Sequence, residues 1–87
     1  MKTIEMANYY KVLGDENRLI ILKALYCTEE ICACNFLKFV NCGQATLSHH
    51  LSVLQNSGLV KARRDGKKIL YACNKTLLKD IMHYLEE

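Results

Sequence analysis

The chain has 87 residues, of which 51% are hydrophobic and 24% charged, with no proline, four glycines and a formal net charge of +3. This is globular composition, so we expect one small domain over residues 1–87, not a disordered or low-complexity protein. Charges interrupt every apolar stretch before it reaches the roughly 20 residues of a membrane span, and the first residues lack a secretory signal, which predicts a cytoplasmic protein without a membrane partner.

Three helices are expected in the first half of the chain. Apolar residues at helical spacing run over residues 4–13, and Gly14 stands where a helix C-terminal glycine is expected. Asp15 can cap a second helix, which is apolar nearly all round and should therefore be buried. Thr28 and the two glutamates after it are typical of a cap and an acidic first turn. They predict a short third helix over residues 31–39.

A fourth helix is predicted over residues 44–57, where three leucines at i, i+4 and i+7 define a buried stripe. His50 lies at the edge of this stripe and is expected to pack. The opposite face carries compact hydrogen-bonding side chains and no acid. Its candidates for reading DNA are Gln44, Thr46, Ser48, His49 and Ser52. Such groups can bond base edges and phosphates, although a merely solvated helix face would look similar.

A β-hairpin should follow, because two β-type runs, residues 59–64 and 68–73, flank Asp65 and Gly66. The second half of the chain carries the whole net charge, concentrated near this hairpin, which indicates a polyanionic partner. The candidate phosphate contacts at its tip are Arg63, Arg64, Lys67 and Lys68. Helix, turn, helix and basic hairpin in this order predict a mainly α fold with a small β-hairpin, a winged helix-turn-helix.

Residues 77–85 predict an amphipathic last helix, which gives the element order ααααββα. The chain is too small to cover this helix's apolar stripe easily, which favours a homodimer. Two-fold symmetry then predicts a palindromic operator in double-stranded DNA. The sequence has no glycine-rich phosphate loop and no nucleophile elbow, so we do not expect an enzyme.

Several segments carry a family resemblance. Residues 13–18 (LGDENR) are similar to the start of a second helix, residues 44–51 (QATLSHHL) to a recognition helix, and residues 57–60 with 63–67 to the start of a wing. Together they resemble the ArsR/SmtB family of metal-responsive winged-helix repressors. Gly43 stands where the family usually has Ser, and glycine is tolerated at a helix N-cap. The resemblance implies a repressor that dimerises through its first and last helices.

Cys32 and Cys34 resemble the Cys-x-Cys metal site on the third helix of arsenic- and cadmium-responsive members. Five cysteines in a reducing compartment indicate metal binding or redox sensing more than disulfides. Thiolates select soft ions, so the expected inducer is As(III) or Sb(III), with Cd(II), Pb(II) or Zn(II) as alternatives. In a regular helix these two side chains would point about 200° apart, so we expect chelation to distort the third helix and release DNA.

The third ligand of such an ion is open. Leu37 occupies the position at which some arsenic sensors have a further cysteine, which leaves Cys27, Cys42 or an exogenous thiol or water. Cys73 ends the hairpin and is expected in the core. A repressor that senses oxidants through the same thiols, and a DNA-binding winged helix without an ion response, are the alternatives.

Overall fold

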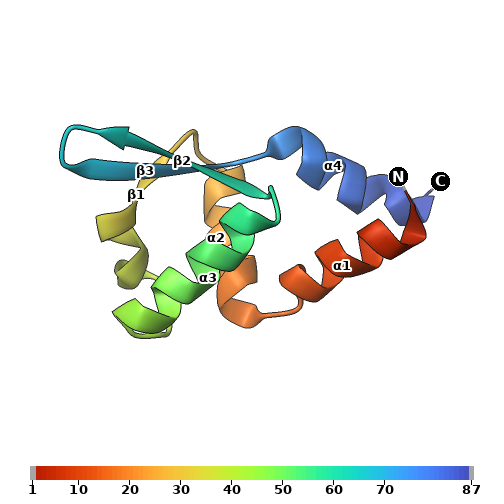
Figure 1. Ribbon diagram of the computed structural model, residues 1–87, viewed down its shortest axis with the longest axis horizontal. Coiled ribbons are helices and arrows are strands. Elements are labelled where there is room, and N and C mark those ends of the chain that lie inside the picture. Colours follow the sequence, from red (N-terminus) through yellow and green to blue (C-terminus); the bar gives the residue numbers. More distant parts are fainter. Residues whose placement is uncertain (1, 87) are drawn as a thin grey trace.

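Residues 2–86 are described by a computed structural model and form helices around a small antiparallel sheet. The α-helices are α1 (Thr3–Leu13), α2 (Glu16–Tyr26), α3 (Gln44–Asn56) and α4 (Lys75–His83), and the 3-10 helices are η1 (Ala33–Lys38) and η2 (Tyr84–Glu86). The strands are β1 (Ile31–Cys32), β2 (Val60–Asp65) and β3 (Lys68–Cys73), in the order β1-β3-β2. The sheet lies at one end of the molecule and α1 and α4 lie at the other (Figure 1). The predicted fold class, a winged helix-turn-helix, is confirmed.

The corner between α1 and α2 follows the sequence prediction closely. Gly14 ends α1, but with φ −77°, so it is not in the left-handed conformation that favours glycine. Asp15 caps α2, because its Oδ1 accepts a hydrogen bond from the backbone N–H of Arg18 at 3.1 Å. The prediction that α2 is buried nearly all round is wrong for Leu19, whose side chain is 52% exposed.

The predicted α-helix over residues 31–39 is wrong. Its first two residues form β1, which pairs with the hairpin strand β3, and the next six form η1. Thr28 does not cap a following helix, because its hydroxyl donates backward to the Ala24 carbonyl at 3.0 Å. The free edge of β3 offers backbone hydrogen bonds to Ile31 and Cys32, and this long-range pairing wins over the local helix signal.

The hairpin of β2 and β3, here called the wing, forms as predicted except at its tip. Asp65 pairs with Lys68, so the two loop residues are Gly66 and Lys67, and not Asp65 and Gly66. Gly66 has φ +64° and no other residue of the loop has a positive φ, as in a two-residue turn with glycine first. A side chain would be strained at this position.

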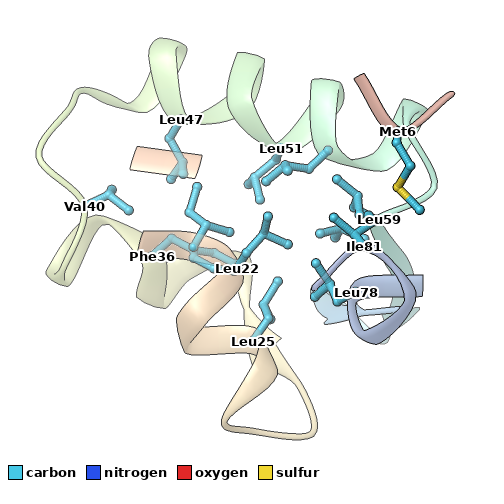
Figure 2. Close-up of a cluster of buried hydrophobic side chains, with 13 residues drawn as sticks. Met6, Leu22, Leu25, Phe36, Val40, Leu47, Leu51, Leu59, Leu78 and Ile81 are labelled. Atoms are coloured by element: carbon cyan, nitrogen blue, oxygen red, sulfur yellow. The ribbon is translucent and has the colours of Figure 1, made fainter. Parts of the chain in front are cut away.

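The core lies where α2, α3 and η1 meet under the wing. The predicted leucine stripe of α3 is confirmed, and Figure 2 shows Leu47 and Leu51 pointing from α3 into the cluster. Phe36 of η1 is fully buried and packs edge-on against Tyr71 of β3, with ring centroids 5.8 Å apart. This contact holds η1 and the wing around the same core as α3.

The first and last helices are joined at the other end of the molecule. The Tyr10 hydroxyl of α1 donates to the Ile81 carbonyl of α4 at 2.7 Å. The hydroxyls of Thr3 and Tyr84 lie 2.5 Å apart. Buried Met6 and Ile81 connect this pair of helices to the main core (Figure 2).

Replacement of Leu54 by alanine should lower the free energy of unfolding by roughly 2–5 kcal/mol, because Leu54 is fully buried and the change leaves a cavity. Urea unfolding followed by circular dichroism at one fixed protein concentration measures this. The matched control is Gln55→Ala on the exposed side of α3, which should stay within about 0.5 kcal/mol of wild type. Equal losses in the two variants would contradict the packing described here.

Candidate functional site

The polar face of α3 is exposed, and part of it lines a groove. All five residues predicted to read DNA are exposed. Three of them, Gln44, Ser48 and Ser52, lie along one wall of a hollow of about 430 Å³ between α3, η1 and the wing. Thr46 and His49 are not among its lining residues. The structure therefore brings three of the predicted residues together and places the other two further round the helix.

The opposite walls of this hollow, here called the α3 groove, come from η1 and β3. They are formed by Ala33, Cys34, Leu37, Ile69 and Tyr71, with Leu47 and Leu51 at its floor. Cys34, one of the two candidate ion ligands, therefore shares the groove with the polar face of α3. A group bound to Cys34 would lie close to the residues predicted to contact DNA.

A buried histidine fixes α3 against the corner between α1 and α2. His50 is 6% exposed, and its Nδ1 accepts a hydrogen bond from Arg18 Nε at 3.1 Å. Arg18 also donates to the Val12 carbonyl at 3.3 Å, and His50 Nε2 lies 3.7 Å from Asp15 Oδ1. The expectation that His50 packs is confirmed. Sequence reasoning did not foresee its partner Arg18, which lies on a different helix.

The four basic residues predicted at the wing tip are all exposed, but they do not face the same way. Arg64 pairs across the hairpin with Ile69, which lines the α3 groove. Arg63 is the residue just before Arg64 on β2, so its side chain leaves the opposite face of the sheet. There it forms a forked ion pair with Glu30, with Nε–Oε2 and Nη2–Oε1 distances of 2.5 and 2.7 Å.

This ion pair affects the titration of both partners. The hydrogen bonds from Arg63 lower the pKa of the Glu30 carboxyl below its ordinary value, and the same contact raises the pKa of Arg63. Both groups therefore stay charged at neutral pH. The sequence around Glu30 predicts a helix start, whereas the partner of this side chain lies 33 residues away along the chain.

The thiols of Cys32 and Cys34, here called the thiol pair, lie side by side. Their Sγ atoms are 2.7 Å apart. Cys32 ends β1 and Cys34 lies in the first turn of η1, so the helical geometry that would separate them is absent. The expectation that an ion must distort a helix to reach both sulfurs is therefore wrong. The structure already brings the two together.

The hydrogen bond between the two thiols shifts their pKa values in opposite directions. It lowers the pKa of Cys32, which gains a donor to its thiolate, and raises the pKa of Cys34. The positive charge of Lys68 favours the thiolate form of both. Cys32 is thus the more readily deprotonated of the two thiols.

The other cysteines lie elsewhere. Among residues 2–86 no three His, Cys, Asp or Glu side chains are grouped to hold a metal ion, so neither Cys27 nor Cys42 joins the thiol pair. Cys73 packs against the core as predicted, and burial raises its pKa. The structure thus offers two sulfur ligands at the site.

None of the helices within the described part of the chain has the length and apolar character needed to cross a membrane.

Comparison with known proteins agrees with this arrangement. Residues 15–62, from α2 into the wing, match the family model described as bacterial regulatory protein, arsR family. The arsenical resistance operon repressor of Staphylococcus aureus is 42% identical over 81 residues, which cover 93% of this chain and 77% of that protein. The cadmium resistance transcriptional regulatory protein CadC of Listeria innocua is 39% identical over 69 residues, covering 79% of this chain and 58% of that protein.

The fold is found among solved structures as well. The ArsR-like transcriptional regulator from Rhodococcus sp. RHA1 superimposes with a TM-score of 0.81 at 28% identity, over 95% of this chain and 77% of that one. These relatives are transcriptional regulators and not enzymes, in agreement with the sequence prediction. The match to the family model and the relatives' identities together show that the chain belongs to the arsR family of bacterial regulatory proteins.

Proposed function

We propose that this protein is a repressor that binds a palindromic operator as a homodimer and leaves it when a thiophilic ion binds Cys32 and Cys34. The observation that carries the ion response is the 2.7 Å approach of the two thiols beside the α3 groove. As(III) or Sb(III) is the expected inducer, ahead of Cd(II), Pb(II) and Zn(II). The arsenical resistance repressor of Staphylococcus aureus is 42% identical to this chain and the cadmium resistance protein of Listeria innocua 39%, which agrees with that order.

The DNA-binding surface in this proposal consists of α3 and the wing. Gln44, Ser48 and Ser52 carry hydrogen-bonding groups that suit base edges, and α3 has no acid to repel phosphates. Thr46 and His49 lie to the side, where they suit backbone contacts. The phosphate contacts proposed on the wing are Arg64, Lys67 and Lys68, because Arg63 is already engaged by Glu30.

The ion in this proposal is held by two protein thiolates, with a small thiol or water from solution completing its coordination. Soft cations prefer thiolate ligands over oxygen, which fits a site built from two cysteines. Cys32 lies in the ladder with β3, and Cys34 lies in the wall of the α3 groove. An ion bridging them would therefore act on the wing and on the approach to α3 together.

The dimer interface in this proposal is the end of the molecule formed by α1 and α4. Three large apolar side chains there are strongly exposed: Ile4 at 71%, Met82 at 54% and Leu85 at 82%. Beside them lies an apolar hollow of about 280 Å³ between α2 and α4, to which Met82 contributes. A second copy would bury this surface, and apolar burial is the main driving force for association.

Replacement of both Cys32 and Cys34 by serine should leave operator binding nearly unchanged and abolish release by the ion. Fluorescence anisotropy of reduced protein on a palindromic duplex, titrated with arsenite, antimonite, cadmium, lead and zinc, measures both properties. Cys27→Ser, at an exposed cysteine outside the thiol pair, is the control and should respond like wild type. Normal release from the double variant would place the ion site elsewhere. Release by peroxide with no response to any ion would select the oxidant-sensing alternative.

Lys67→Gln should weaken operator binding and flatten its dependence on salt. Each lost phosphate contact lowers the slope of log K against log salt by about 0.9, so the loss of one contact from each subunit of a dimer lowers it by about 2. Lys79→Gln, an exposed lysine on α4 far from the wing, is the matched control. If both variants keep the wild-type slope, the wing tip does not contact phosphate.

Leu85→Glu should convert a dimer into a monomer by placing a charge in the proposed interface. Light scattering after size-exclusion chromatography should then change from twice the 10.0 kDa chain mass to the chain mass itself. Leu37→Glu, at another exposed leucine on η1, should remain dimeric. A dimer that survives Leu85→Glu but not Leu37→Glu would move the interface to the opposite end of the molecule.

A further inference from the structure

Three residues form one row across the sheet. Arg63 of β2 and Cys32 of β1 both pair with Leu70 of the central strand β3. Residues directly opposite each other in neighbouring strands project from the same face. Arg63 and one member of the thiol pair therefore lie on the same face, two strands apart.

Arg63 reaches across this face to the residue just before Ile31, where β1 begins. Its guanidinium holds both carboxylate oxygens of Glu30, with N–O distances of 2.5 and 2.7 Å. Two parallel charged hydrogen bonds of this kind fix orientation as well as distance. The segment that carries Cys32 is thus fastened to β3 by backbone pairing and to β2 by a side-chain clamp.

The clamp is partly exposed, with the side chain of Arg63 56% and that of Glu30 32% accessible. Exposed ion pairs contribute little to the free energy of folding. The clamp therefore acts mainly on the geometry of this region and not on the stability of the fold. It fixes where the start of β1 lies relative to the wing.

We propose that the Glu30–Arg63 clamp couples the thiol pair to the wing, and that Arg63 is a positioning residue for this coupling and not a phosphate contact. The inference rests on the proposed release of the operator by an ion at Cys32 and Cys34. An ion that displaces Cys32 also displaces Glu30, two residues earlier in the chain. The clamp transmits this displacement to β2, which carries Arg64. Without the clamp, only the two-residue pairing with β3 joins β1 to the wing, so a smaller part of the shift reaches β2.

The test measures DNA contact and coupling separately. Operator affinity is measured as a function of salt concentration, with and without saturating arsenite. Arsenite affinity is measured by calorimetry. Arg63→Gln should keep the wild-type salt slope and bind the ion within about threefold of wild type, while the ion's effect on operator affinity falls by about tenfold or more. Glu30→Gln should lose the ion's effect to the same degree. Lys67→Gln should do the opposite, with a flatter slope and an unchanged ion effect.

A charge-swapped variant, Glu30→Arg with Arg63→Glu, should restore part of the ion's effect, which a general loss of structure would not do. Matching circular dichroism spectra and melting temperatures show that each variant is folded. The proposal is overturned if Arg63→Gln flattens the salt slope as much as Lys67→Gln, or if both single variants keep the full ion effect. Failure of the wild-type protein to respond to any ion would instead reject the proposed function, and the coupling with it.

Discussion

The pairing of two residues with the edge of the wing, Ile31 with Tyr71 and Cys32 with Leu70, determines how the parts of this protein are arranged. It turns the segment before α3 into a strand followed by a 3-10 helix, and this change of backbone brings the thiols of Cys32 and Cys34 together. The same pairing adds β1 to the wing in a three-stranded sheet, so the proposed ion site lies directly against the wing. A site on an independent helix would have had to distort that helix first.

Local signals are enough to predict most of the fold. The Asp15 cap, the leucine stripe of α3 and the wing follow from short-range rules that residues obey wherever they lie in a chain. The string QATLSHHL also resembles the recognition helix of the family, which predicts the DNA-reading role proposed for α3. The exposed polar face of α3 and the neighbouring basic hairpin can thus be placed in the correct order, although their contacts cannot.

What the sequence could not show depends on long-range contacts. The helix predicted over residues 31–39 follows from a local cap and acidic-turn signal, but the open edge of β3 offers its first two residues long-range backbone partners. Glu30 fits a helix start equally well, and only folding places it beside Arg63. The same limit applies to Arg18, whose bond to His50 joins two helices that are far apart in the sequence. In each of these cases the sequence shows which residue is present but not which group folding places in contact with it.

The elongated shape, 41 Å along its longest axis, separates the proposed DNA-binding surface from the proposed dimer interface. The sheet lies toward one end of that axis with α3 beside it, and α1 and α4 lie at the other end (Figure 1). In the proposed dimer joined through α1 and α4, the wing and the first part of α3 both lie far from the interface (Figure 1). A small rotation of one protomer against the other would then displace the two α3 helices and the two wings together. Such a rotation would change the distance between the two α3 helices, and the proposed operator binding requires that distance to match the separation of successive major grooves, about 34 Å.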